Sequence, residues 1–243
     1  MFQLLFPQYA RRRWVYLPLG TLALGEQRPG MPNPLLDPVY CKRWVRRLHR
    51  RYRASCSYGG WFEDRSILWQ GHYMAPHCAF HLGVDFNVPE NSRVYSPAEA
   101  RVVEVWHDED TRGGWGGRIV LEVRPRLYLL LAHLGTIRVR LNAHLRAGQL
   151  VGSVGGPTNN GNWFPHLHAQ MIRGSFDHID GYGEFSVRNQ RKFPDPFMFW
   201  PPQHALSPAD LAEPRRGRKR PGGRRRPPGG AEGRDRPWPG PLI

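Results

Sequence analysis

The sequence reads RIVLEVRPRLYLLLAHL at residues 118–134, and this stretch gives the clearest indication of the fold class. Its two halves, Arg118–Val123 and Leu127–Ala132, are short and consist mostly of β-branched or apolar residues, which is typical of strands. The residues between them include Pro125, a turn signal. The stretch is therefore predicted to form two strands joined by a turn.

Three further runs of the same kind surround this stretch, at Arg101–Trp106, Leu150–Val154 and Leu167–Ile172. Glycine-rich turns separate the runs: GGWGG at 113–117, RAGQ at 146–149 and GGPTNNG at 155–161. From about residue 78 onward we find no heptads, no internal repeat and no long helical pattern. Five short strands with turns between them predict a mainly β domain with an antiparallel sheet or sandwich. We assign residues 54–204 to this domain.

The chain has 243 residues, enough for one medium-sized domain with extensions. It contains no run of about 18 apolar residues, so no transmembrane helix is expected. Its net charge of +15 lies at the two ends. Residues 1–53 carry 11 Lys and Arg against 2 acidic residues, and residues 214–243 carry 10 against 2. The middle is slightly acidic, which argues against a nucleic-acid footprint inside the predicted domain.

Residues 1–53 are predicted to form a basic N-terminal arm. Residues 1–36 are rich in Pro, Gly and Arg, show no period and are expected to be irregular. A helix is predicted over 38–53, because Asp37 suits an N-cap and Pro38 suits the first helical position. One aromatic and apolar stripe runs along it, formed by Tyr40, Trp44, Leu48 and Tyr52. We expect a surface helix docked by this stripe; the alternative is a contact for an acidic polymer or a membrane surface.

Residues 205–243 are predicted to be a disordered tail. The final 30 residues contain 7 Gly, 7 Pro and 10 Lys or Arg, a composition that buries too little apolar surface to offset chain entropy. The basic arms suggest contact with a polyanion, such as nucleic acid, a teichoic-type polymer or anionic lipid. A tail without any function is the competing interpretation.

Two further features bear on the compartment. Cys41, Cys56 and Cys78 are an odd number in a chain too large to need disulfides, so free thiols are expected. Residues 11–24 imitate a signal peptide, but Pro18 and Gly20 interrupt the apolar part and no Ala-x-Ala site follows. No convincing signal peptide is predicted, and the cytoplasm and the cell envelope both stay open.

Histidines mark three segments of the predicted domain. His166 and His168 are two residues apart at the start of a predicted strand, so both leave the same face. His133 follows the run ending at Ala132 and is expected at the end of that strand.

A fourth histidine, His81, precedes Asp85 by four residues. Four extended residues span about 13 Å, too far for two ligands of one ion, so this segment must bend. Gly83 lies between the two residues and permits the bend.

The region from about Phe80 to Ile172 resembles the LytM/lysostaphin-type zinc metallopeptidases, peptidase family M23. Four elements carry the resemblance in family order: His81-x-Gly83-x-Asp85, Ala132-His133-Leu134, Gly148-Gln149-x-x-Gly152 and Pro165-His166-Leu167-His168. A less-studied branch of the family is further suggested by the GGWGG turn, by NGNW at 160–163, by DGYG at 180–183 and by PDP at 194–196.

The resemblance implies a catalytic metal site. His81, Asp85 and His168 would bind one Zn²⁺, with a water in the fourth position. His166 would be the general base that takes the proton of the water and later protonates the leaving amine. His133 would orient the water or stabilise the tetrahedral oxyanion, and the alternative exchanges these two roles.

The implied activity is that of a zinc endopeptidase on peptides containing glycine or D-amino acids, such as peptidoglycan cross-links. A catalytically silent module that keeps the fold for binding or regulation is one alternative. Loss of ligands is the usual mark of such modules, and no ligand is lost here. The second alternative is a cytoplasmic peptidase that acts on peptides unrelated to the cell wall.

Other residues that can bear chemistry lie near the predicted site in the sequence. His72, His77 and Cys78 fit no standard zinc-finger spacing, and residues 107–110 are expected to be a solvated hairpin loop. Trp115, Trp163 and Phe164 either wall the cleft or pack beside glycine turns. Ala169-Gln170 departs from the aromatic–acid pair usual in the family, which puts local backbone shape and substrate fit in doubt. The insertion at 173–192 is expected to fold over the site as a loop.

Overall fold

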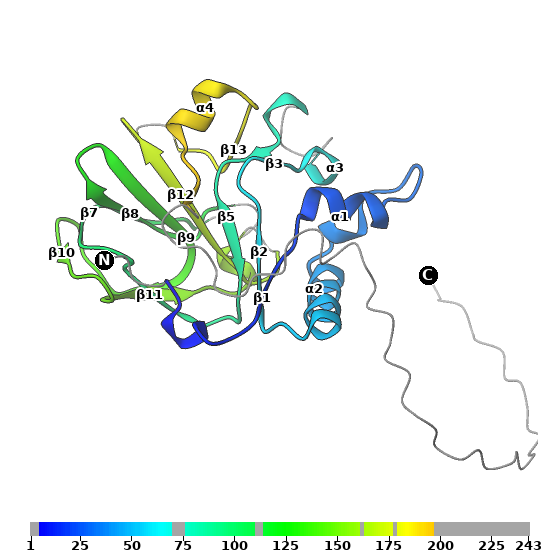
Figure 1. The fold of residues 1–243 in the computed structure, drawn as a ribbon, viewed down its shortest axis with the longest axis horizontal. Coiled ribbons are helices and arrows are strands. Elements are labelled where there is room, and N and C mark those ends of the chain that lie inside the picture. Colours follow the sequence, from blue (N-terminus) through cyan, green and yellow to red (C-terminus); the bar gives the residue numbers. More distant parts are fainter. Residues whose placement is uncertain (1–4, 70–75, 110–113, 161–162, 177–178, 197–243) are drawn as a thin grey trace, which may run out of the picture.

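A computed structural model describes residues 5–69, 76–109, 114–160, 163–176 and 179–196. A large sheet dominates it, with the strand order β1-β2-β5-β12-β9-β8-β7-β10 (Figure 1). Its strands are β1 (Trp14–Tyr16), β2 (Cys56–Gly59), β5 (Val84–Asn87), β12 (Leu167–Arg173), β9 (Leu127–Ile137), β8 (Gly117–Arg124), β7 (Ala100–His107) and β10 (His144–Leu145). Strand β11 (Leu150–Val154) pairs with β9 and with β6 (Arg93–Tyr95). Of the described pairings only β1 with β2 is parallel, so the predicted mainly β, antiparallel fold is confirmed.

All five predicted strands are present, as β7, β8, β9, β11 and β12. Their bounds differ from the prediction by at most one residue, except that β9 continues to Ile137. The side chains from Leu129 to Ala132 are fully buried because apolar clusters cover the sheet on both faces. A strand covered on both sides needs apolar residues at successive positions rather than in alternation. This explains the unbroken LLLA run.

A small antiparallel sheet lies beside the large one. It contains β3 (Glu63–Asp64), β4 (Phe80–His81) and β13 (Tyr182–Gly183) in the order β13-β4-β3. Two short helices accompany it, α3 (Ser66–Trp69) and α4 (Val187–Lys192). The insertion at 173–192, which was expected to be a loop, thus contributes a strand and a helix; its residues 177–178 lie outside the described part.

Residues 5–36 are more ordered than the sequence suggests. Instead of an irregular segment, they include strand β1, helix α1 (Leu19–Glu26) and 3-10 helices at Pro7–Tyr9 and Pro34–Leu36. Periodicity is missing because β1 is short and pairs directly with β2, and because α1 packs closely on the backbone of the small sheet. At Gly20, which interrupts the apolar part of residues 11–24, an added Cβ would lie 1.8 Å from the Asp64 carbonyl oxygen, so the close packing of α1 requires glycine there.

The predicted basic helix is α2 (Pro38–Tyr52). The Asp37 side chain accepts from the backbone N–H of Tyr40, and Pro38 is the first helical residue, as predicted. Trp44 is 4% exposed, while the remaining members of the stripe are half-buried in a cluster that also contains Trp163 and Phe164. The helix is docked by its aromatic stripe and leaves most of its arginines exposed.

Several predictions concern residues that the structure does not describe. The predicted disordered tail at 205–243 and the last residues of the predicted domain, 197–204, lie outside the described part. Among the described helices, none combines the length and the apolar character needed to cross a bilayer. The three cysteines are free thiols, as expected, and Cys41 and Cys56 are buried.

Candidate metal centre

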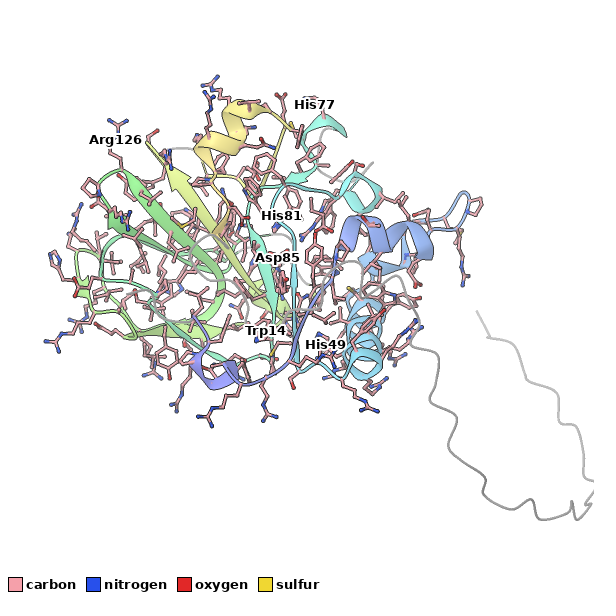
Figure 2. The ribbon with its side chains drawn as sticks, viewed as in Figure 1. Trp14, His49, His77, His81, Asp85 and Arg126 are labelled. Atoms are coloured by element: carbon pink, nitrogen blue, oxygen red, sulfur yellow. The ribbon has the colours of Figure 1, made fainter. Side chains whose placement is uncertain are left out.

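Three metal-ligating side chains converge between the two sheets. The Nε2 atom of His81 lies 3.0 Å from Nδ1 of His168 and 3.3 Å from Oδ1 of Asp85, and Nδ1 of His168 lies 3.1 Å from the same oxygen. All three residues are at most 3% exposed. Figure 2 shows His81 and Asp85 next to each other. Tetrahedral zinc with bonds of about 2.0–2.1 Å needs donor atoms about 3.3 Å apart, so the spacing suits a single ion.

Strand pairing explains two members of this cluster. In the antiparallel pair β5–β12, His168 is directly opposite Asp85. Opposite residues of such a pair have Cβ atoms about 4.5–5.5 Å apart and face the same side, so both reach one point.

The third member, His81, comes from β4 in the small sheet. The chain bends at Leu82 and Gly83 before it enters β5, as the spacing of His81 and Asp85 predicts. A Cβ on Gly83 would lie 2.6 Å from the Ala169 carbonyl oxygen and 2.7 Å from Nε2 of His168. Only glycine allows the bend to approach His168 this closely.

Hydrogen bonds on the outer ring nitrogens determine the tautomers. Nδ1 of His81 lies 3.0 Å from the Gly60 carbonyl oxygen, and Nε2 of His168 lies 2.9 Å from Oε1 of Gln170. We therefore assign the protons to these outer nitrogens, because both partners are acceptors. The inner nitrogens then carry lone pairs that face each other and the Asp85 carboxylate.

This arrangement satisfies the chemistry of a divalent cation site. Two imidazole lone pairs and a carboxylate oxygen repel one another at 3.0–3.3 Å unless a cation lies between them. Burial, followed by the charge of Arg65, lowers the pKa of His81 to about 4, so this imidazole is neutral at neutral pH. The donor set is the one that zinc prefers.

Arg65 holds the outer oxygen of Asp85. Its Nη1 lies 2.6 Å from Oδ2, and its side chain is fully buried. Burial opposes ionisation of Asp85, but His81 and the Arg65 guanidinium outweigh it and keep the pKa of Asp85 well below its usual value. Arg65 also pairs with Glu63 at 3.0 Å and donates to the Tyr182 hydroxyl at 3.3 Å. Sequence reasoning missed Arg65, because no spacing pattern connects it with Asp85.

His166 lies beside the cluster. Its Nδ1 donates to the carbonyl oxygen of Phe164 at 2.8 Å, which leaves the lone pair on Nε2. That nitrogen lies 3.9 Å from Oδ1 of Asp85. Burial lowers the pKa of His166, so the ring is a neutral base at neutral pH.

His133 occupies a distorted part of β9. The sequence predicts that the strand ends at His133. Instead, β9 continues through a bulge at which its pairing with β8 and β11 shifts register. His133 adopts φ +63°, a left-handed conformation that costs energy for a residue other than glycine. The distortion brings its ring centroid to 4.5 Å from that of His166. Burial lowers the pKa of His133 well below its usual value, with His166 adding to the effect.

Aromatic side chains surround these histidines. Trp115 stacks on His133 at 6.1 Å and meets His168 edge-on at 5.4 Å. Trp163 lies 5.9 Å from His166, and its Nε1 donates to the Leu35 carbonyl oxygen at 2.9 Å. Trp115 and Trp163 thus adjoin the centre, and Trp163 also packs with Phe164 in the cluster that contains residues of α1 and α2.

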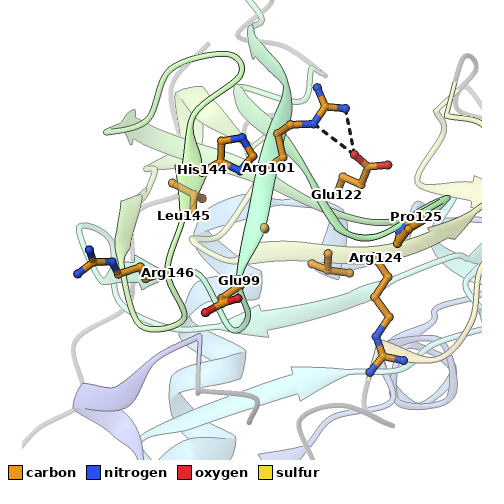
Figure 3. A pocket seen from close by; sticks show the side chains of 10 residues that line it. Glu99, Arg101, Glu122, Arg124, Pro125, His144, Leu145 and Arg146 are labelled. Carbon is orange, nitrogen blue, oxygen red and sulfur yellow. Dashed lines mark hydrogen bonds and ion pairs between the residues drawn. The ribbon is translucent and has the colours of Figure 1, made fainter.

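Two other groups lie apart from this centre. His77 and Cys78 approach Glu184, with His77 Nε2 3.4 Å from Oε1, but the His77 and Glu184 side chains are exposed; His72 lies outside the described residues. A cavity of about 630 Å³ opens at β7, β8 and β10 and is lined by charged side chains, including the Arg101–Glu122 pair (Figure 3). It contains none of the five predicted site residues.

Comparison with known proteins gives consistent matches. The profile of Peptidase family M23 matches residues 79–180. The catalytic domain of the antimicrobial peptidase lysostaphin from Staphylococcus simulans is 26% identical, with a TM-score of 0.38, over 44% of this chain and 76% of that domain. A zinc containing peptidase from Vibrio cholerae is 25% identical, with a TM-score of 0.35, over 39% of this chain and 28% of that one. A mutant of the catalytic domain of the prophage-encoded M23 protein EnpA from Enterococcus faecalis is 23% identical, with a TM-score of 0.38. The match covers 47% of this chain and 80% of that domain.

Proposed function

We propose that the chain, whose residues 79–180 match the profile of peptidase family M23, is a zinc metalloendopeptidase of that family. We further propose that it hydrolyses peptides containing glycine or D-amino acids, such as peptidoglycan cross-links. The observation that carries the proposal is the convergence of two imidazole lone pairs and one carboxylate oxygen at 3.0–3.3 Å, with a further neutral histidine beside them.

His81, Asp85 and His168 would hold the ion. When bound, zinc supplies a Lewis acid and lowers the pKa of a coordinated water to about 7. The protein contributes a buried set of ligands whose tautomers are already fixed by Gly60 and Gln170, so little reorganisation is needed on binding.

His166 would be the general base. Its lone pair on Nε2 is on the side of Asp85, and its Nδ1–H is held by the Phe164 carbonyl. A base in this orientation can take a proton from the attacking water and return it to the leaving amine, a role typically worth about 10²- to 10⁴-fold in rate.

His133 would orient the water or stabilise the developing oxyanion. Its ring lies beside His166, and its Nδ1 is buried with no hydrogen-bond partner among the described residues. A buried polar nitrogen without a partner is well suited to meet a group that arises only during the reaction. The exchange of roles between His133 and His166 is distinguished by the pH dependence of kcat in single variants.

Metal analysis and digestion test the proposal together. We expect about one equivalent of zinc per purified chain, and cleavage of sacculi or oligoglycine peptides into fragments that mass spectrometry identifies. The His168→Ala variant should lose both the zinc and the cleavage. His144→Ala, in an exposed part of β10, is the matched control and should keep both.

Two outcomes would contradict the proposal. If His168→Ala cleaves as fast as the wild type, the assigned ligands are wrong. If the wild-type chain binds zinc tightly but cleaves none of these substrates, the alternative of a silent binding module is favoured.

A further inference from the structure

A second recess opens on the face of the sheet that carries the metal centre. It has a volume of about 340 Å³ and lies between α2 and the end of β5. Asn87 lines it, and Asn87 is two residues from Asp85 on β5, so both side chains leave the same face about 7 Å apart. Phe164 and Pro165 form the other side, directly before His166. We call this recess the α2 groove.

The α2 groove carries unpaired positive charge. Lys42 and Arg46 both line it from α2. Within the part of the chain that the structure describes, neither forms an ion pair with a carboxylate. Glu90 lies at the rim, but its carboxylate is directed to Gly156, where an added Cβ would lie 2.7 Å from Oε1.

The groove also contains a buried acceptor. Asn87 is 3% exposed, and its Nδ2 donates to Oγ of Ser57 at 2.9 Å. Ser57 Oγ in turn lies 2.8 Å from Nε2 of His49, which fixes the orientation of the amide. The Oδ1 atom of Asn87 then has no hydrogen-bond partner among the described residues. A buried acceptor in this state is satisfied by a ligand that brings an N–H.

We propose that the α2 groove binds a carboxylate-bearing residue of the peptide substrate. Lys42 and Arg46 pair with the carboxylate, and Oδ1 of Asn87 accepts a backbone N–H of the bound peptide. An extended peptide advances about 3.3 Å per residue, so this residue lies two or three positions from the scissile bond. The inference rests on the proposed peptidase function and adds the charge of its substrate.

One wall of the α2 groove is formed by residues outside the region that matches the family profile. The family match covers residues 79–180, whereas Lys42, Arg46 and His49 belong to α2, outside that range. The basic helix, which the metal centre leaves without a role, thus provides the charged wall of the groove.

Paired peptides test the inference. We would measure kcat/KM for glycine pentapeptides that carry a single Glu or, as the neutral isostere, a single Gln at each position in turn. At a position two or three residues from the cleaved bond, the wild type should prefer Glu about 5-fold or more, mainly through KM. The double variant Lys42→Glu with Arg46→Glu should lose or reverse this preference.

The matched control is Arg43→Glu with Arg50→Glu, which changes the net charge equally at exposed sites of α2 outside the groove. It should keep the preference for Glu. Equal preference in the wild type and the Lys42/Arg46 variant, or equal loss in both double variants, would overturn the inference.

A binding measurement separates this inference from the proposed function. Calorimetry on the full-length His168→Ala chain, with the same Glu and Gln peptides, reports recognition without turnover. Tighter binding of the Glu peptide that depends on Lys42 and Arg46 supports the groove even if no peptide is cleaved by the wild type. Cleavage without any difference between the two peptides retains the peptidase and rejects the groove.

Discussion

Arg65 and Asp85 form an ion pair in which Nη1 lies 2.6 Å from Oδ2, and the Arg65 side chain is fully buried. The other oxygen of Asp85 faces His81 and His168. One oxygen of the carboxylate therefore pairs with the guanidinium, and the other faces the two imidazoles. The guanidinium determines which oxygen remains for a metal ion and holds the rotamer that presents it.

Removal of Arg65 should weaken both folding and metal binding. Arg65→Ala leaves Glu63 and Asp85 buried without their partner, which is expected to cost about 3–5 kcal/mol of unfolding free energy. Zinc affinity should fall about 10- to 100-fold, because a second partner of a ligand is lost. Urea unfolding and zinc competition with a chromophoric chelator measure the two effects.

Two variants make this prediction specific. Arg65→Lys keeps the charge but not the fork of donors, and should fall between Ala and the wild type. Arg118→Ala removes an ion pair of 2.7 Å with Glu104 that is partly exposed, and should cost at most about 1 kcal/mol. Wild-type zinc affinity in folded Arg65→Ala would disprove the positioning role.

Gln170 is expected to control the tautomer of His168. Its Oε1 accepts from Nε2 of His168, and its own Nε2 donates to the Asp180 carbonyl oxygen at 3.1 Å. Gln170→Leu removes the acceptor, so zinc affinity should fall about 10- to 100-fold in the chelator assay. Gln170→Glu restores an acceptor and should recover much of the affinity. Equal affinity in both variants would show that the tautomer is fixed in another way.

The sequence predicts the metal centre better than its surroundings. The grouping of His81, Asp85 and His168 follows from the family resemblance, and the bend at Gly83 and the shared face of His168 and Asp85 agree with it. Arg65 is missed because a buried ion pair leaves no periodic signal, and its partner lies 20 residues away. The position of His133 is predicted incorrectly because a bulge, which no residue pattern marks, continues β9 beyond it. The sequence also fails to predict β1 and α1, because both are stabilised by contacts with segments that are distant in the sequence.

A substitution at Gly83 tests how tightly the chain is packed at the bend before β5, and a substitution at Gly25 in α1 provides the comparison. Gly83→Ala places a Cβ 2.6 Å from the Ala169 carbonyl oxygen, so the backbone must move, at a cost of about 1–3 kcal/mol. Gly25→Ala, in helix α1, meets nothing within 4 Å and should stabilise the protein by about 0.5–1 kcal/mol. Urea unfolding distinguishes the two, and similar effects would contradict the close approach at Gly83.

His49 should make the fold sensitive to acid. Burial lowers the pKa of His49 from 6.5 to about 4 in the folded state. The unfolded chain therefore binds more protons between these values, and stability is lost as the pH falls from about 6.5 towards 4. Between pH 7 and pH 5 this residue alone should remove about 2 kcal/mol of unfolding free energy.

The contribution of His49 is isolated by comparison with His49→Gln, which keeps a polar partner for Ser57 but does not titrate. The wild type should lose about 2 kcal/mol more than this variant over the same pH range, as measured by urea unfolding at each pH. His144→Gln, at an exposed position, should retain the wild-type pH dependence. If His49→Gln and the wild type lose stability in parallel, the imidazole of His49 is accessible to protons in the folded protein, and the packing of α2 against Ser57 is looser than the 2.8 Å contact implies.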